Sequence, residues 1–180
     1  MPKTEGYRGV SSMAFPYSTF GLSSTFGIRP SAFLRHLTFD LRHLTPMFLV
    51  SREIDFCYGH RLLNYAGKCR HLHGHNGRAL ITFRAESLDD RGMVLDFGEI
   101  KNLVSRWIDD NLDHRMVLQR DDPAVPVLQQ LGEPVYLLDV NPTAENIAKL
   151  IFDVALAQGV PVVEVRVWET PRCCATYHQA

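Results

Sequence analysis

Long apolar segments are missing from this chain of 180 residues. No run approaches the roughly 18 apolar residues that a membrane-spanning helix requires, so we expect a soluble protein. An excess of charge is missing as well, because 19 basic and 20 acidic side chains give a formal net charge of -1. The composition therefore offers no electrostatic reason to expect binding to nucleic acid or to an anionic membrane. A local basic patch could still hold a phosphorylated small molecule.

Cysteines are few, and no secretory signal precedes them. Two of the four, Cys173 and Cys174, are adjacent, and the others are Cys57 and Cys69. A chain of this length does not need disulfide bonds to stabilise its core, so we expect reduced thiols and a cytoplasmic location. Histidine is more informative, since five of the eight histidines lie in the segment 60–114.

The first 46 residues show neither helical nor alternating periodicity and contain only two acids, Glu5 and Asp40. Ser-rich segments that are poor in acids are typical of targeting peptides. The alternative that we favour is a start codon assigned too far upstream, with translation beginning at Met47. In both cases we expect residues 1–46 to be poorly ordered and residues 47–180 to form the folded domain.

Residues 47–180 alternate between strand and helix patterns in an order that predicts one α+β domain. Alternating apolar positions predict strands, and apolar positions three and four apart predict two helices. The second helix has Thr143 as its N-cap and Gly159 as its stop. The polar, proline-containing segment 119–134 is interpreted as an excursion. The predicted strands are 48–56, 71–84, 93–95 and 162–168, with 93–95 returning as a hairpin partner after the turn at 89–92. We expect both helices on one face of a mainly antiparallel sheet.

A cluster of histidines gives the sharpest chemical signal. His71, His73 and His75 would project from one face of a strand, because side chains alternate along it. His60 ends the preceding strand and could approach the same point. Three neutral imidazoles around a tetrahedral ion with a vacant fourth position are typical of a catalytic zinc site, and hard oxygen-loving ions would not choose such ligands.

The pattern alone does not identify the third ligand of this site. His60, His71 and His114 all remain candidates beside His73 and His75. A structural site that includes Cys69 also remains open.

Six short motifs occur in a fixed order along the chain. Together they make the sequence similar to the 6-pyruvoyl-tetrahydropterin synthase superfamily from Met47 to about Thr176. They are Phe56–Leu62, Gly67–Lys68–Cys69 with His73–Gly74–His75, Val94–Phe97, Leu112–Asp113–His114, Asn141–Glu145 and Trp168–Glu169–Thr170. Each motif is weak alone, but the six together are specific.

Three residues separate Cys69 from the His73–Gly74–His75 motif. This spacing resembles the 6-carboxy-tetrahydropterin synthase branch, which supplies the queuosine pathway, rather than the biopterin-forming branch. The resemblance implies a tunnelling fold (T-fold), in which subunits associate so that their sheets form a barrel. It also implies a homo-oligomer with pterin sites between subunits.

The resemblance implies particular roles for site residues. The implied zinc ligands are His60, His73 and His75, and Cys69 is the implied catalytic acid/base. His71 has no role that the resemblance assigns.

Three further residues match the catalytic pattern of the family. Asp113 and His114 are the implied pair that assists the cysteine, and Glu169 is the implied carboxylate that anchors the pterin ring. Each also has a plain structural interpretation, as a surface pair or a strand-end acid. The chain departs from the family at Cys57 and Tyr58, where small residues are frequent, at Arg115, and in the longer segment 119–134.

The implied reaction converts 7,8-dihydroneopterin triphosphate to 6-carboxy-5,6,7,8-tetrahydropterin, with release of acetaldehyde and triphosphate. Zinc would act as a Lewis acid, and a cysteine thiolate would serve as the base near neutral pH. One alternative is the pyruvoyl-forming synthase, which keeps all three side-chain carbons. Another, from a different class, is a non-catalytic, zinc-stabilised pterin-binding module, which predicts closed coordination by four protein ligands.

Overall fold

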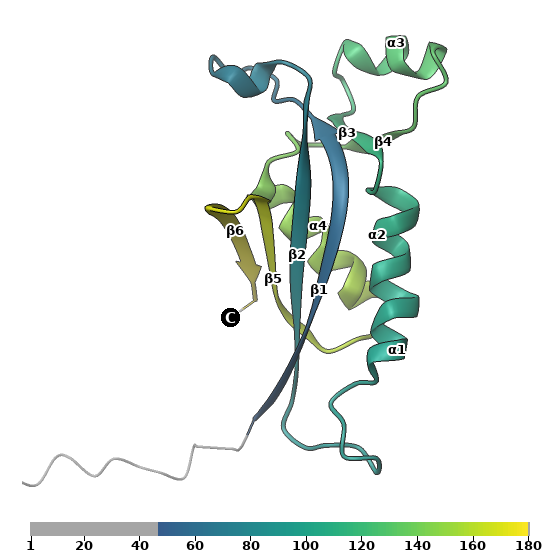
Figure 1. The fold of residues 1–180 in the computed structure, drawn as a ribbon, viewed down its shortest axis with the longest axis vertical. Coiled ribbons are helices and arrows are strands. Elements are labelled where there is room, and N and C mark those ends of the chain that lie inside the picture. The colour runs from purple at the N-terminus through teal and green to yellow at the C-terminus, as the bar shows by residue number, and fades with distance from the viewer. Residues whose placement is uncertain (1–46, 180) are drawn as a thin grey trace, which may run out of the picture. The chain divides into compact units, whose positions relative to one another are not determined.

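A computed structural model describes residues 47–179, and the predictions made for residues 1–46 lie outside this range. The described part contains one six-stranded sheet with the strand order β4-β3-β1-β2-β5-β6 (Figure 1). The strands are β1 (Phe48–His60), β2 (His73–Ala85), β3 (Arg115–Gln119), β4 (Val135–Leu138), β5 (Val162–Thr170) and β6 (Cys173–His178). The pairs β1–β2, β2–β5 and β5–β6 are antiparallel, whereas β1–β3 and β3–β4 are parallel.

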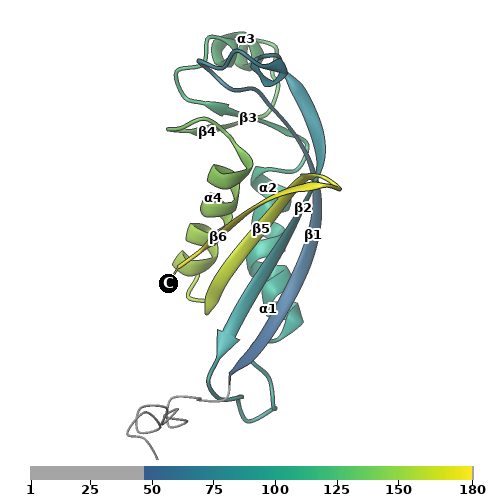
Figure 2. The same cartoon turned by 90° about the vertical axis from the view of Figure 1, so that its left-hand side faces the viewer.

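Two long helical segments cover one face of this sheet, as Figure 2 shows. The first runs through α1 (Phe97–Ile100), a π-helical turn η4 (Lys101–Ser105) and α2 (Arg106–Asn111), and the second is α4 (Ala144–Ala157). Their apolar sides pack on the inward residues of β1, β2 and β5 in one buried cluster, which includes Ile81, Phe83, Ile108, Ile151 and Val165. The α+β architecture with two helices on one face is confirmed.

The predicted ends of α4 are also confirmed. The Thr143 hydroxyl accepts a hydrogen bond from the backbone N–H of Asn146 (3.4 Å), as an N-cap does. Gly159 follows the helix with a φ of 78°, the left-handed conformation that glycine adopts without steric cost. Pro142 directly precedes the N-cap Thr143, and its carbonyl faces the candidate site described below.

The prediction of a strand at 93–95 is wrong. In this segment Asp89 organises a tight turn: its carboxylate accepts hydrogen bonds from the backbone N–H groups of Arg91 and Met93 (both 2.9 Å). The apolar side chains of Val94 and Leu95 pack against the core instead of pairing with a strand. The consecutive strands that pair antiparallel are β1 with β2 and β5 with β6.

The segment 119–134 and the C-terminus contain more structure than the sequence predicted. Strands β3 and β4 flank a short helix, α3 (Ala124–Gln130), and β6 follows β5. The sheet is therefore mixed, because the two parallel pairings on the β3–β4 side were not predicted. The second strand begins at His73 instead of residue 71, since Lys68–Arg70 forms a 3-10 turn, η3. No helix within residues 47–179 is long and apolar enough to cross a membrane.

An ion pair connects the end of β1 to the loop before α3. The guanidinium of Arg61 donates two hydrogen bonds to the carboxylate of Asp122, which is 2% exposed and also accepts from Ala124 N–H (2.7 Å). Burial alone would raise the pKa of Asp122, but the hydrogen bonds from Arg61 and Ala124 hold it below its usual value. The resulting stabilisation is present above the carboxyl's unfolded-state pKa and is lost as pH falls through the folded-state value.

We expect Asp122→Ala to lower the free energy of unfolding at pH 7 by about 1–3 kcal/mol, because it leaves the guanidinium without its partner. Asp121→Ala, which removes the exposed neighbouring carboxylate, is the matched control and should change the stability little. Urea unfolding at pH 7 and at successively lower pH measures both variants. The deficit of Asp122→Ala should shrink in acid, and unfolding midpoints equal to those of the unmodified chain at pH 7 would contradict this prediction.

Candidate metal centre

Three imidazoles converge at one end of the β1–β2 pair. In the register of these strands His60 lies opposite His73, and Tyr58 lies opposite His75, so all four side chains share one face. The Nε2 atom of His60 is 3.1 Å from Nε2 of His73 and 3.1 Å from Nε2 of His75. His60 is 2% exposed and the other two are half-buried. The structure therefore brings together the three histidines that the resemblance indicated.

The second nitrogens of two rings fix the orientation of this cluster. His60 Nδ1 donates to the carbonyl of Pro142 (2.7 Å), and His73 Nδ1 donates to the carbonyl of His71 (2.8 Å). Since a carbonyl only accepts, Nδ1 carries the proton and Nε2 presents a lone pair in both neutral rings. Burial, the largest influence, lowers the pKa of His60, which favours the neutral form that binds metals.

The Nε2 lone pairs of His60 and His73 repel each other at this distance, and a cation between them would remove the repulsion. Metal–nitrogen bonds of about 2.0–2.1 Å in a tetrahedral site place ligand nitrogens roughly 3.3 Å apart, close to the observed spacing. The donor set thus fits a divalent transition metal. His71 lies outside β2 and its side chain does not join the cluster. Its backbone carbonyl instead accepts the hydrogen bond from His73 Nδ1 that orients this ring. The predicted position of His71 on the same strand face is therefore wrong.

Glu169 lies beside this cluster because β5 is irregular at that position. Trp168 pairs with Cys174 and Thr170 with Cys173, which leaves Glu169 as the extra residue of a bulge. Its Oε1 atom is 3.8 Å from Nε2 of His60. It also accepts a hydrogen bond from the hydroxyl of Tyr58 (3.0 Å).

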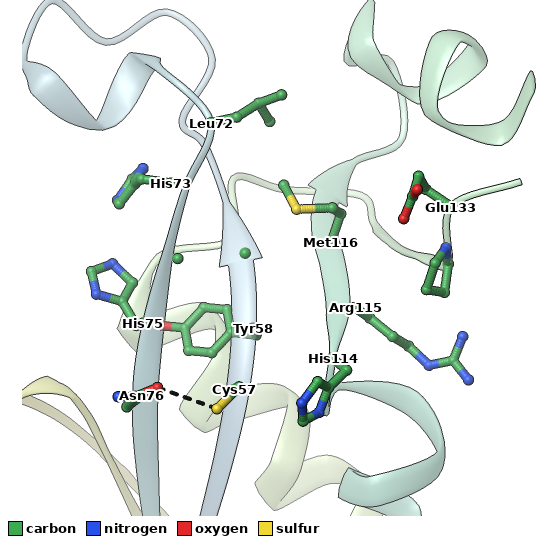
Figure 3. A pocket seen from close by; sticks show the side chains of 13 residues that line it. Cys57, Tyr58, Leu72, His73, His75, Asn76, His114, Arg115, Met116 and Glu133 are labelled. Carbon is green, nitrogen blue, oxygen red and sulfur yellow. Dashed lines mark hydrogen bonds between the residues drawn. The ribbon is translucent and has the colours of Figure 1, made fainter. Parts of the chain in front are cut away.

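Tyr58 was not predicted as a site residue; its only signal was a large aromatic at a position where small residues are frequent. The ring is buried, and it contacts the rings of His60 and His75 at centroid distances of 5.4 and 5.7 Å. Figure 3 shows Tyr58 beside His75. Burial, followed by the charge and hydrogen bond of Glu169, raises the pKa of Tyr58 well above its usual range. The hydroxyl consequently remains a donor to Glu169 at ordinary pH.

Cys69 lies in the 3-10 turn η3, between β1 and β2. The turn is tied back to the end of β1 by a hydrogen bond from Leu62 N–H to the Cys69 carbonyl (2.8 Å). Cys69 lines a cavity of about 250 Å³ together with His60 and Glu169. Thr143 and Glu145 at the start of α4 line the same cavity, as do both C-terminal cysteines. The thiol of Cys69, the imidazole of His60 and the carboxylate of Glu169 therefore line the same cavity.

Asp113 and His114 form the predicted pair, but in a different place. His114 Nδ1 donates to one carboxylate oxygen of Asp113 (2.8 Å), and the other oxygen accepts from the backbone N–H of Cys57 (2.7 Å). These hydrogen bonds and the nearby imidazole outweigh the effect of burial and lower the pKa of Asp113. His114 has a φ of 54°, uncommon for a non-glycine residue, and its side chain is 80% exposed.

His114 lines a second, open pocket of about 600 Å³, shown in Figure 3, instead of the cavity that contains Cys69. The thiol nearest to this pair is Cys57, which was noted only as a departure from the family. Cys57 donates to the side-chain oxygen of Asn76 (3.2 Å) and lies within 4.8 Å of the potential ligand atoms of Asp113 and His114. By strand alternation it faces away from Tyr58 and the three histidines. Within one chain, the described structure does not bring Cys69 and His114 into one cavity.

Comparison with known proteins agrees with this fold. The family model described as 6-pyruvoyl tetrahydropterin synthase matches residues 49–180. A solved structure of 6-pyruvoyl tetrahydropterin synthase from Caenorhabditis elegans superimposes with a TM-score of 0.56 at 25% identity, over 76% of this chain and 98% of that one. An uncharacterized protein from Wolinella succinogenes superimposes with a TM-score of 0.63 at 28% identity, over 74% and 99% of the two chains. The chain belongs to the 6-pyruvoyl tetrahydropterin synthase family and has its T-fold.

Curated relatives narrow the resemblance further. A 6-carboxy-5,6,7,8-tetrahydropterin synthase of Rickettsia typhi is 40% identical over 138 residues, which cover 71% of this chain and 97% of the relative. A protein of the same name from Haemophilus influenzae is 30% identical over 141 residues, covering 74% and 100% of the two chains. The family places the chain among tetrahydropterin synthases, and these relatives support the carboxy-forming branch.

Proposed function

We propose that this protein converts 7,8-dihydroneopterin triphosphate and one water molecule to 6-carboxy-5,6,7,8-tetrahydropterin, acetaldehyde and triphosphate. The observation that carries the proposal is the convergence of three Nε2 atoms beside a cavity that Cys69 and Glu169 also line. A metal-facing group, a thiol and a carboxylate are the parts that this reaction needs in contact with one substrate. The similarity to 6-carboxy-tetrahydropterin synthases supports this product.

The metal of the proposal is Zn²⁺, held by His60, His73 and His75, because zinc favours three neutral imidazoles and keeps a fourth position for a substrate. Bound there, it would supply Lewis-acid polarisation of the substrate's side-chain oxygens. The chain's own contribution is to fix the ligands: the carbonyls of Pro142 and His71 hold two rings in the tautomer that presents Nε2.

Proton transfer is assigned to Cys69 and binding of the pterin ring to Glu169. A thiol near a cation ionises more readily, and a thiolate can then remove a proton from a side-chain carbon of the substrate. Glu169 would accept two parallel hydrogen bonds from the amino-pyrimidine edge of the pterin, a charge-assisted contact. Both groups line the cavity of about 250 Å³ beside His60.

We assign the Asp113–His114 pair to the active site of a neighbouring subunit. The pair is formed and His114 is exposed, yet it lies outside the cavity of its own Cys69, as expected if it completes a site across an interface. Strands β4 and β6 are the outer strands of the described sheet, and edge strands are the ordinary points at which sheets of different subunits pair. This assignment requires a homo-oligomer, and we propose that the sheets of its subunits join into a barrel.

Product analysis tests the proposed reaction. We expect the zinc-loaded protein to consume 7,8-dihydroneopterin triphosphate with one acetaldehyde and one triphosphate released per 6-carboxy-tetrahydropterin, measured by mass spectrometry and aldehyde trapping. A product that retains all three side-chain carbons would instead indicate the pyruvoyl-forming reaction. This reaction is the second candidate because the family model is described as 6-pyruvoyl tetrahydropterin synthase. Binding of the pterin without turnover would reject both. Queuosine biosynthesis and a cytoplasmic location remain predictions beyond this test.

A further inference from the structure

Glu169 is placed so that it could act in either of two incompatible ways. Its Oε1 atom is 3.8 Å from Nε2 of His60, whereas ligand atoms of one tetrahedral zinc ion lie roughly 3.3 Å apart. In its present position the carboxylate does not join the three imidazoles as a ligand group, and rotation of its side chain toward them would be needed to make it a fourth protein ligand. A metal held by three histidines and a carboxylate would have no position for a substrate, and a carboxylate bound to metal could not receive a pterin.

The contact that opposes this rotation is the hydrogen bond from the Tyr58 hydroxyl to the same Oε1 atom (3.0 Å). Tyr58 is 3% exposed and cannot turn freely, because its ring is stacked on Phe56 (5.3 Å between centroids) and packs against the rings of His60 and His75. Its hydroxyl is thus a fixed donor, and it engages the carboxylate oxygen that lies near the metal-facing nitrogen.

We propose that Tyr58 is a positioning residue that keeps Glu169 out of the metal's coordination shell and so maintains an open fourth position. The metal site and the pterin-binding role of Glu169 are taken from the proposed function. The role of Tyr58 is inferred from its own contacts with Glu169, Phe56 and the histidine rings. The bulge of β5 brings Glu169 toward the histidines, and the phenol stops it short of coordination. The same hydrogen bond leaves Oε2 and the plane of the carboxylate available to a ligand in the cavity.

The test uses metal-free protein reloaded with one equivalent of Co²⁺, with azide as the probe for an open coordination position. Azide binding is followed through the visible spectrum of the cobalt. The unmodified protein should bind azide. Tyr58→Phe keeps the ring and removes the donor, so Glu169 should coordinate and azide affinity should fall about tenfold or more, with slower loss of the metal. Tyr136→Phe, which removes a partly buried hydroxyl from a ring packed on Trp107, is the matched control and should behave like the unmodified protein.

A double variant identifies the group that closes the site. The double variant that carries both Tyr58→Phe and Glu169→Gln should regain azide binding, because an amide binds Co²⁺ or Zn²⁺ much more weakly than a carboxylate does. Equal azide affinity in the unmodified protein and Tyr58→Phe would overturn the inference, and so would a loss that the double variant does not restore.

Glu169→Gln alone gives an answer that does not depend on how well Tyr58→Phe folds. If Tyr58 already holds Glu169 off the metal, this variant should bind azide as the unmodified protein does. A large gain in azide affinity would show that Glu169 is a ligand in the unmodified protein and would overturn the inference. Failure of the protein to bind Co²⁺ at all would overturn the metal centre of the proposed function as well, so the two failures are distinguishable.

Discussion

Cys69→Ala and His114→Ala chains, each nearly inactive alone, are expected to regain activity when they are mixed within one oligomer. Each substitution removes a group assigned to proton transfer, so each should lower kcat by about 10²- to 10⁴-fold. The structure places the two side chains in different cavities of one chain. If each site takes Cys69 from one subunit and His114 from another, a mixed oligomer contains sites in which both are intact.

The expected recovery follows from simple counting. Random association of equal amounts gives about one site in four with both groups, hence about a quarter of the unmodified activity. The two variants are unfolded together, refolded and assayed for acetaldehyde release. Cys69→Ala mixed with Glu169→Gln is the matched control: these two residues line the same cavity of one chain, so no mixed site contains both. Recovery of activity in the control mixture would refute the inter-subunit assignment. So would a lack of recovery in the mixture of Cys69→Ala and His114→Ala, once mass measurement has shown that the two chains share oligomers.

His73→Gln is expected to abolish stoichiometric metal binding while leaving the fold largely intact. Loss of a group that only hydrogen-bonds to a metal ligand already lowers metal affinity roughly 10- to 100-fold, and removal of the ligand itself should lower the affinity further. The matched control is His71→Gln, because His71 supplies its backbone carbonyl, which the substitution preserves, and not its side chain. Metal content after dialysis measures both variants, and metal retention by His73→Gln at the level of His71→Gln would contradict the assignment.

Removal of the metal by a chelator distinguishes the two hypotheses for this protein, an enzyme and a non-catalytic module that zinc stabilises. The buried cluster extends along the helices and the sheet away from the histidines, so most of the stability should not depend on the ion. We expect chelation to stop turnover with little change in the circular dichroism spectrum. A module that depends on its metal for folding would unfold on chelation instead.

Strand alternation was enough to predict that His73 and His75 share a face, because the side-chain period of a strand does not depend on its partners. The position of His71 could not be predicted in this way, because His71 directly follows the turn η3 and lies before the start of β2 at His73. Tyr58 and the Pro142 carbonyl act through contacts between segments that are far apart in the chain. Such contacts are fixed by the packing of α4 and the bulge of β5, which leave no local signal.

The parallel part of the sheet was missed for a related reason. Strands β3 and β4 are short, and the proline-containing segment between them carries a helix that is itself only one or two turns long. Short apolar runs of this kind fit a loop as well as a strand until a neighbouring strand is known. The longer elements, β1, β2, the helix from α1 to α2, and α4, were predicted because each repeats its pattern over several turns or pleats.

The hydrogen bond from His60 to Pro142 links the metal centre to the start of helix α4, because Pro142 directly precedes the N-cap Thr143. If the proposed ion binds there, its occupancy and the docking of the first turn of α4 would be thermodynamically coupled, and each would favour the other by the same free energy. Thr143 and Glu145 of that turn also line the cavity. Loading the metal would consequently pre-shape part of the substrate's surroundings before any substrate arrives.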